Sequence, residues 1–537
     1  MERWSGRVAV VTGASGGIGR AIVRVLVNKG LKVVGLDCAA VDSEFSDSLQ
    51  DAPGKFYSIV TDLTKEDEIL SAFSWVKEHL EGVDILANVA GVCLVDKLSE
   101  GVTSDWRRML DVNVLALSIC TREALKSMRE RGVDDGHIVH IGSINGVRVL
   151  DNVILSMYAA SKHAVRSLTE GLRKELNQLR SRIRVSIINP GSVRTAMAAT
   201  ALTEEMLNTI PMMEAEDMAD IVVYLLSTPL RVQVHEVIVQ PNEIYVDCHV
   251  ASSKTLVCNY GWQRYINTLK IKSIFLVKII DFYHSCSSRS AGMERWGGKV
   301  AVVTGASGGM GTAAVRALVR RGLSVVGLDR QPFDDQIANS LHNAKGKLFT
   351  ITTDVTKEED ILSAFGWVKD NLGGVDILIN TAGVCHRSKL SEGDTAVWRR
   401  MLDVNVLALS ICTREALKSM RERGVDDGHI VHIGSIAGHF VPNSTGAGIY
   451  TASKHAVTTL AEALRRELNL LNMPIKITNI SPGGVRTNLI AGIVPEERLK
   501  SMPLMEPEDI ADAIIYTLST PPRVKVHEII IRPNGEA

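Results

Sequence analysis

Short apolar runs alternate with helical patterns along the first half of the chain. Residues 7–12 form a valine-rich run that is typical of a strand buried on both faces. Glycines follow, and a helical pattern then extends from residue 18 to residue 29 and ends at Gly30. Further strands are predicted at residues 31–36, 57–60, 83–88, 137–142 and 184–189. Strands that alternate with helices predict a doubly wound α/β domain, in which helices cover both faces of a parallel sheet.

The same pattern occurs twice in the chain. Met1-Glu2-Arg3-Trp4 recurs from Met293, and Tyr158 recurs as Tyr450, so the offset stays at 292 residues. A repeat of this size predicts two tandem domains and not a solenoid. We expect one domain at residues 1–242, a second at residues 293–537, and an irregular junction at residues 243–292 that matches neither. Because the second domain opens with its own methionine, a fusion of neighbouring genes or a mispredicted chain is an alternative interpretation.

Composition and charge exclude several classes of protein. The formal net charge is −1 with 23% charged residues, which gives no reason to expect binding to nucleic acid or anionic lipid. The 8 cysteines include no Cys-x-x-Cys pair, so neither a metal site nor a disulfide framework is expected. The N-terminus shows no secretory signal, and the apolar run at 274–280 is shorter than the roughly 20 residues that a membrane span needs. We therefore expect a cytoplasmic protein without a membrane anchor.

A glycine-rich turn follows the first predicted strand. The sequence Thr-Gly-Ala-Ser-Gly-Gly-Ile-Gly at residues 12–19 has a counterpart at residues 304–311. Backbone N–H groups and the positive end of a helix would meet there, as binding of a pyrophosphate requires. An ordinary βα turn is the alternative. Asp37 and Asp329, however, follow the last apolar residue of the second strand, where an acid hydrogen-bonds the adenosine ribose in dinucleotide-binding folds. Together the two features favour a dinucleotide.

Tyr158 and Lys162, repeated as Tyr450 and Lys454, stand four residues apart and so share one helical face. A phenol with a pKa near 10 is a poor base at neutral pH unless positive charge stabilises its phenolate. A lysine one turn away, together with an oxidised nicotinamide ring, would supply that charge. A chance pair on a surface helix is the alternative.

Two further polar residues accompany this pair in each copy. Ser143 and Ser435 follow a predicted strand, where a hydroxyl would hold a substrate oxygen, and Asn113 and Asn405 lie in mid-helix, an unfavourable place for asparagine without a specific task. Residues 106–144 are identical to residues 398–436, so agreement between the copies within this block is weak support for function. The tyrosine and lysine lie outside the block, among neighbours that differ, and their persistence is modest independent support.

Taken together, these motifs resemble the short-chain dehydrogenases/reductases. The motifs stand in that family's order, namely Thr-Gly-x3-Gly-x-Gly, Asn88-Val-Ala-Gly91 (Asn380-Thr-Ala-Gly383), Asn113, Ser143, Tyr-x3-Lys and Pro190-Gly191. The resemblance covers both copies nearly end to end, and the opening Met-Glu-Arg-Trp and closing Val-x-Val-His-Glu are similar to the insect farnesol dehydrogenase-like branch. It implies two tandem Rossmann domains, an NAD(P)-dependent alcohol dehydrogenase or carbonyl reductase, and a homo-oligomer or an internal pseudo-dimer of the two copies.

The resemblance also implies a role for each motif residue. The tyrosines would be the acid/base, the lysines would lower the tyrosine pKa and bind the nicotinamide ribose, the serines would orient the substrate oxygen, and the asparagines would hold a proton-relay water. The catalytic set implied is Asn113, Ser143, Tyr158 and Lys162 in the first copy and Asn405, Ser435, Tyr450 and Lys454 in the second. The cofactor contacts implied are Gly13, Ser15, Gly17, Ile18, Gly19, Asp37, Asp62, Asn88, Ala90, Gly91, Pro190, Gly191 and Thr195, and then Gly305, Ser307, Gly309, Met310, Gly311, Asp329, Arg330, Asp354, Asn380, Ala382, Gly383, Pro482, Gly483 and Thr487.

Cofactor choice is where the chain departs from the farnesol branch. That branch usually prefers the phosphorylated cofactor and carries a small residue followed by arginine, where this chain has Asp37-Cys38 and Asp329-Arg330. A carboxylate would face a 2′-phosphate at close range, and this like-charge contact costs affinity. We therefore predict NAD(H). NADP(H) is the alternative, more so in the second copy, where Arg330 would recruit a phosphate.

The segment expected to cover the substrate is residues 194–213. It is aliphatic and rich in methionine in the first copy (Met197, Met206, Met212 and Met213) and aliphatic in the second (Leu489, Ile490, Ile493 and Met502). Core packing is one interpretation of these side chains, and a pocket for an apolar alcohol such as farnesol or a retinoid is the other. For the whole chain, the alternative to two enzymes is that one domain only binds dinucleotide or serves as a pairing partner.

Overall fold

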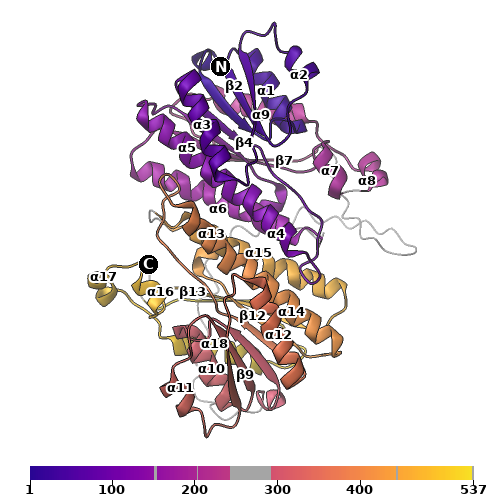
Figure 1. The fold of residues 1–537 in the computed structure, drawn as a ribbon, viewed down its shortest axis with the longest axis vertical. Helices are drawn as coiled ribbons and strands as arrows, with labels where there is room; N and C mark the ends of the chain where they lie inside the picture. The colour runs from indigo at the N-terminus through magenta and orange to yellow at the C-terminus, as the bar shows by residue number, and fades with distance from the viewer. Residues whose placement is uncertain (150–153, 202, 242–291, 443–445, 535–537) are drawn as a thin grey trace, which may run out of the picture.

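Each copy folds as a parallel sheet between two layers of helices. The computed structural model describes residues 1–149, 154–201, 203–241, 292–442 and 446–534. Within these ranges each copy forms a seven-stranded sheet, in the order β3-β2-β1-β4-β5-β6-β7 in the first and β10-β9-β8-β11-β12-β13-β14 in the second. All neighbouring strands are parallel. The predicted pair of doubly wound α/β domains is confirmed (Figure 1).

The predicted strands of the first copy all form, with boundaries that differ by one or two residues. The strands are β1 (Val8–Thr12), β2 (Lys32–Asp37), β3 (Lys55–Val60), β4 (Ile85–Asn88), β5 (His137–Ile141), β6 (Arg184–Pro190) and β7 (Glu236–Val239). The helices are α1 (Gly17–Asn28), α2 (Ser43–Asp47), α3 (Glu66–Leu80), α4 (Thr103–Leu110), α5 (Leu117–Glu130), α6 (Ser156–Gln178), α7 (Ala196–Ala201), α8 (Glu204–Thr209) and α9 (Ala215–Ser227).

The second copy repeats these elements. Its strands are β8 (Val300–Thr304), β9 (Ser324–Asp329), β10 (Lys347–Thr352), β11 (Ile377–Asn380), β12 (His429–Ile433), β13 (Lys476–Pro482) and β14 (Glu528–Ile531). Its helices are α10 (Gly309–Arg320), α11 (Asp335–Ser340), α12 (Glu358–Leu372), α13 (Thr395–Leu402), α14 (Leu409–Glu422), α15 (Gly448–Leu470), α16 (Asn488–Ala491), α17 (Glu496–Ser501) and α18 (Pro507–Ser519).

The strand order places a crevice at one edge of each sheet. The chain leaves β1 toward β2 on one side, whereas β4 pairs with the other side of β1, so the order reverses between β1 and β4. Loops that leave the carboxyl ends of these two strands diverge to opposite faces. In open α/β sheets, ligands bind in the crevice outside such a switch point. Thr12 and Asn88 end the two strands and pair in register there.

Two apolar layers stabilise each sheet. On one face, α1 and α9 pack against alternate side chains of β1 and β2, with Ile22, Leu26 and Val222 fully buried. On the other face, side chains of α3, α5 and α6 form a core cluster that continues into the corresponding helices of the second copy. Burial of apolar area is the dominant favourable term in folding, so this shared cluster joins the copies energetically as well as spatially.

The copies face each other across α6 and α15, which lie together at the centre of the molecule (Figure 1). The helices approach closely where small residues meet, since an added Cβ on Gly171 would lie 3.5 Å from the Cα of Gly448. Ion pairs flank the crossing, from Arg107 to Asp403 at 2.9 Å and from Arg399 to Asp111 at 2.7 Å. The two copies therefore pack as an internal pair within one chain.

The predicted junction at residues 243–292 lies outside the described residues except for Gly292, so its irregular structure and the exact domain boundaries stay predictions. Within the described ranges, no helix is both long and apolar enough to cross a membrane.

Candidate active site

The glycine-rich turn between β1 and α1 depends on contacts that only glycine permits. Gly13 has a φ of +71°, and an added Cβ would lie 2.8 Å from the backbone of Ala90. A Cβ on Gly19 would lie 2.0 Å from the carbonyl oxygen of Gly13, so the start of α1 packs directly on the turn. The N-cap of α1 is Gly16, which supplies no side-chain cap. The N–H groups of the first turn are therefore left for an anion, and this cradle fits a pyrophosphate.

The segment after β6 closes the other side of this cradle. A Cβ on Gly17 would lie 2.9 Å from Cγ2 of Thr195, which brings the threonine against the start of α1. Pro190 ends β6, and the N–H of Gly191 donates to the carbonyl oxygen of Val239 at 2.8 Å. The predicted cofactor residues of α1 and of the β6 end thus lie side by side, as a dinucleotide that spans the crevice requires.

Asp37 ends β2 next to the glycine turn. Its carboxylate accepts the backbone N–H of Ser15 at 3.0 Å and that of Ala39 at 3.2 Å. The acid therefore fixes the glycine turn and places a carboxylate beside it at the end of β2. These backbone contacts were not part of the prediction for Asp37.

Asp62 follows β3 and lies in a turn. Its carboxylate accepts the hydroxyl of Thr64 at 2.7 Å and the N–H of the same residue at 3.0 Å. These hydrogen bonds hold the pKa of Asp62 below its ordinary value, so the group stays ionised at neutral pH. An anion at this place suits a hydrogen bond to an adenine amino group.

The turn after β4 is held by the last residue of β1. The hydroxyl oxygen of Thr12 accepts the N–H of Val89 at 3.0 Å and of Ala90 at 3.1 Å. Asn88 donates from Nδ2 to the hydroxyl of Thr121 at 3.1 Å, and its Oδ1 has no partner within the described residues. Thr12 is not among the predicted site residues, although its position before Gly13 in the motif was the available signal.

Tyr158 lies in the first turn of α6 with its phenol against Ser143. The two hydroxyl groups are hydrogen-bonded, and Ser143 also accepts the N–H of Asn145 at 3.1 Å. Burial raises the pKa of Tyr158 above its ordinary value, and the hydrogen bond from Ser143 opposes that rise. The phenol is therefore a proton donor at neutral pH in this state of the protein.

Lys162 lies one turn further along α6, behind the tyrosine. Its ammonium Nζ is 5.8 Å from the centroid of the Tyr158 ring and donates to the carbonyl oxygen of Ile141 at 3.0 Å. Burial lowers the pKa of Lys162 to about 8, so the group is still largely charged at neutral pH. An ammonium has three donors. Ile141 engages one of them, and the other two are left for a ribose.

Asn113 lies in a π-helical turn, Asp111–Ala116, between α4 and α5. Its Nδ2 donates to the carbonyl oxygen of Val92 at 2.9 Å and to the hydroxyl of Ser161 at 3.0 Å, while its Oδ1 accepts the N–H of Val92 at 2.8 Å. Isolated π-helical turns occur frequently at functional sites. Asn113 thus joins the loop after β4 to the helix that carries Tyr158. Ser161, within the Tyr-x-x-Ser-Lys motif, was not predicted as its partner.

Cys93 is a further residue of the site that was not predicted. Its buried thiol lies near both Tyr158 and Lys162. Burial raises the pKa of Cys93 to about 11, so the thiol is neutral and acts as a small apolar group. Its repeat as Cys385 was the available signal in the sequence.

The second copy reproduces the arrangement. Lys454 donates to the carbonyl oxygen of Ile433 at 3.0 Å and lies 5.9 Å from the Tyr450 ring centroid, and burial lowers its pKa to about 8. Asn405 donates to the carbonyl oxygen of Val384 at 2.9 Å, and Ser435 is hydrogen-bonded to Tyr450. The structure therefore brings together a tetrad of Asn, Ser, Tyr and Lys in each copy.

The cofactor cradle of the second copy matches the first as well. Gly305 has a φ of +65°, the N–H of Ser307 donates to Asp329 at 3.0 Å, and a Cβ on Gly309 would lie 3.0 Å from Thr487. Asp354 accepts the hydroxyl of Thr356 at 2.7 Å. Arg330 follows Asp329 and lies near enough to Asp354 to help lower the pKa of that carboxyl.

The predicted covering segment contains α7 and α8, and Met213 pairs with Val193 in an isolated bridge outside the sheet. Met213 is buried in the core with α9, which is the packing interpretation. Met197 is 36% exposed, and the hydroxyl of Thr200 donates to the carbonyl oxygen of Cys93 at 3.3 Å. This last contact places α7 beside the tetrad.

Comparison with known proteins assigns the family. A model of the short chain dehydrogenase family matches residues 7–206 and 299–498. A farnesol dehydrogenase of Aedes aegypti is 47% identical over 248 residues, and the alignment covers 45% of this chain and 99% of that protein. Dehydrogenase/reductase SDR family member 11 of Bos taurus is 47% identical over 253 residues, covering 45% and 99%. The solved short-chain dehydrogenase/reductase of Serratia marcescens is 30% identical, with a TM-score of 0.41, and covers 45% of this chain and 99% of its own. Because the family model matches both copies, the chain belongs to the short chain dehydrogenase family and carries its domain twice.

Proposed function

We propose that each copy transfers a hydride between a nicotinamide dinucleotide and an alcohol or carbonyl substrate. The observation that carries this proposal is the convergence of Tyr158, Ser143 and Lys162 beside a glycine cradle at the switch point of the sheet. The same convergence in the second copy supports two sites of one kind. A nicotinamide dinucleotide, when bound, accepts or supplies the hydride.

Tyr158 is proposed as the proton donor in reduction and the proton acceptor in oxidation. Its phenol is neutral at pH 7 because burial raises its pKa, which suits donation to a developing alkoxide. In the other direction the phenolate needs nearby positive charge, and the Lys162 ammonium lies behind the ring to supply it. Ser143 already donates or accepts at the phenol, so its hydroxyl is placed to hold the substrate oxygen next to Tyr158.

Lys162 is proposed to bind the nicotinamide ribose, and Asn113 is proposed to position the loop after β4. The contact with Ile141 fixes the ammonium, whose free donors would hold the nicotinamide ribose. Asn113 connects Val92 to Ser161 and so sets the loop after β4 against α6. A relay water would sit between Asn113 and Lys162, where a Cβ on Gly91 would lie 3.3 Å from Oδ1 of the former and 3.4 Å from Nζ of the latter.

NAD(H) is the proposed cofactor. The carboxylates of Asp37 and Asp329 stand at the adenosine side of each cradle and would accept from ribose hydroxyl groups. They would repel a 2′-phosphate. The second copy is expected to discriminate less, because Arg330 adds a positive charge there.

We propose an apolar alcohol, such as farnesol or a retinoid, as the substrate. The similarity of about half of the chain, the length of one copy, to a farnesol dehydrogenase supports this choice. The neutral thiol of Cys93 and the partly exposed Met197 present apolar surface near the tetrad, as an isoprenoid chain requires.

Separate tyrosine substitutions test the proposal in the full chain. Tyr158→Phe and Tyr450→Phe each remove one phenol and leave the ring, and dehydrogenase activity with farnesol is followed through the reduced nicotinamide. Each single variant should retain the activity of the other copy, whereas the double variant should lose at least about 100-fold. If either single change abolishes all activity, one domain is only a binding or pairing partner. If the double variant stays active, the phenols are not the acid/base.

A further inference from the structure

We propose that each active site is completed by a glutamate of the other copy. Glu467 of α15 positions the loop between β4 and α4 (residues 89–102) of the first copy, and Glu175 of α6 positions the loop between β11 and α13 (residues 381–394) of the second. Both glutamates act through these loops and are positioning residues. This inference rests on the proposed function.

The β4–α4 loop begins inside the first active site. Val92 exchanges two hydrogen bonds with Asn113, and the thiol of Cys93 lies near Tyr158 and Lys162. A Cβ on Gly91 would lie 3.4 Å from Nζ of Lys162. A shift of this loop would therefore move the residues that surround the phenol and the ammonium.

The far end of the same loop is held by the second copy. Glu467 accepts the N–H of Leu98 at 3.0 Å and of Ser99 at 3.2 Å, and it also accepts the hydroxyl of Ser99. The glutamate is fully buried, and burial raises the pKa of its carboxyl while these hydrogen bonds oppose the rise. A buried acceptor that loses its donors is costly, so the carboxylate and the loop fix each other.

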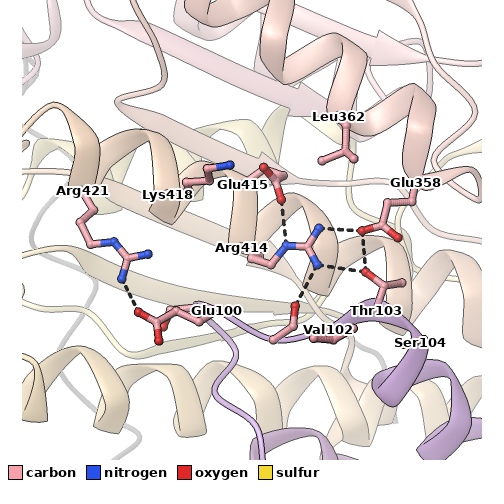
Figure 2. Close-up of a pocket in the computed structure, with 12 residues that line it drawn as sticks. Glu100, Val102, Thr103, Ser104, Glu358, Leu362, Arg414, Glu415, Lys418 and Arg421 are labelled. Atoms are coloured by element: carbon pink, nitrogen blue, oxygen red, sulfur yellow. Dashed lines mark hydrogen bonds and ion pairs between the residues drawn. The ribbon is translucent and has the colours of Figure 1, made fainter.

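An arginine of the second copy makes further contacts to this part of the first copy (Figure 2). Arg414 donates to the carbonyl oxygen of Gly101 at 2.9 Å and to the hydroxyl of Thr103 at 3.0 Å, and it is itself paired with Glu358 at 2.7 Å. Arg421 bonds to Glu100 at 2.5 Å. These residues line an open groove of about 670 Å³ between the copies. The chain therefore contacts the second copy from Leu98, near the end of the loop, to Thr103, the first residue of α4.

The reverse contacts hold the second active site. Glu175 accepts the N–H of Leu390 at 3.1 Å and the hydroxyl of Ser391, and Arg122 donates to the carbonyl oxygen of Gly393 at 3.0 Å. The loop held in this way begins at Thr381 and carries Cys385, which lies near Tyr450 and Lys454. Each glutamate lies on the helix that bears the tyrosine and lysine of its own copy, so the helix of one site supports the loop of the other.

Because each glutamate contacts the loop of the other copy, its substitution should affect the active site of the other copy and not that of its own. In the full chain, the Tyr450→Phe background reports the first site alone and the Tyr158→Phe background reports the second. Glu467→Gln keeps the side-chain volume but turns one of the two acceptor oxygens into an NH₂ donor, which faces the N–H of either Leu98 or Ser99. We expect kcat/KM at the first site to fall at least about tenfold, mainly through kcat, because displaced positioning groups reduce catalysis steeply. Activity at the second site should persist, although Glu467 belongs to that copy.

Glu175→Gln is the matched variant. It should lower kcat/KM at the second site and leave kcat/KM at the first site unchanged. An effect of Glu467→Gln on its own copy as large as the effect on the other copy, or no effect on either, would overturn the inference. If both backgrounds are inactive while the glutamates are intact, it is the proposed function that fails.

The second-site activity of Glu467→Gln also shows that the variant is folded. Should Glu467→Gln not fold, Ser99→Ala carries the test, since it removes only the hydroxyl that the glutamate accepts. Ser99→Ala should lower kcat/KM at the first site several-fold, and unchanged first-site activity would overturn the inference.

Discussion

The backbone N–H of Ser15 donates to the carboxylate of Asp37 at 3.0 Å, and Ser307 donates to Asp329 at the same distance. In both copies, the acid that would select the cofactor therefore also stabilises the glycine turn through this hydrogen bond. Substitution of the acid can distinguish these two roles. The charge would act on the ribose of the cofactor, whereas the hydrogen bond stabilises the turn.

Replacement of the acid by serine is expected to shift cofactor preference. Asp37→Ser removes the negative charge but keeps a hydroxyl near Ser15, so the ratio of kcat/KM for NADPH over NADH should rise about tenfold at the first site, which corresponds to about 1.4 kcal/mol. Asp329→Ser should produce a larger rise, because Arg330 stands beside it. Each ratio is measured in the tyrosine background that silences the other copy. An equal loss of activity with both cofactors would mean that Asp37 serves the turn alone.

Gly13 cannot accept a side chain. Its φ of +71° disfavours L residues, and an added Cβ would lie 2.8 Å from the backbone of Ala90. We expect Gly13→Ala to lower the free energy of unfolding by about 1–3 kcal/mol and to weaken NADH binding. Gly16→Ala is the matched control for stability, since a Cβ there meets only the carbonyl oxygen of Gly13 at 3.5 Å. Thermal unfolding measures the stability of both variants. Equal stability of Gly13→Ala and Gly16→Ala would contradict the strained geometry at Gly13.

The pH dependence of reduction should report Lys162. Burial lowers its pKa to about 8, so the side chain is protonated well below that pH and loses its charge above it. The pKa of Tyr158 is raised, so the phenol keeps its proton throughout this range. In the Tyr450→Phe background, kcat/KM for carbonyl reduction should be level at lower pH and fall above about pH 8. Lys162→Arg should lower the overall rate but remove this fall, because a guanidinium stays charged. A profile that stays level to about pH 10 would contradict the shift.

Local patterns were sufficient to predict the elements that carry the site. Valine-rich runs fix where β1 and β2 lie, and the four-residue spacing of Tyr158 and Lys162 places both on one face of α6. Asn113 was expected in mid-helix, where it lies, but its π-helical turn depends on backbone geometry that no spacing reveals.

The contacts between the copies were beyond prediction from sequence. Glu467 and Ser99 are 368 residues apart in the chain, and nothing near either residue indicates the other. Their contact depends on how α6 and α15 pack, which is decided by three-dimensional fit and not by local periodicity. The same reason explains why Cys93 and Ser161 were missed, because their roles arise from neighbours brought together by the fold.

The packing of α6 on α15 is testable at Gly171. A Cβ there would lie 3.5 Å from Cα of Gly448 and 3.8 Å from Cγ1 of Val441, which is ordinary contact, and the second copy has Ala463 at the equivalent position. Gly171→Ala should therefore raise the free energy of unfolding by about 0.5–1 kcal/mol, since alanine loses less backbone entropy in a helix. Gly171→Leu would drive its side chain into α15 and should destabilise the chain by about 1–3 kcal/mol. Denaturant unfolding measures both changes. If leucine is as well tolerated as alanine, the two helices do not pack closely in solution, and the crossed support of the two active sites loses its framework.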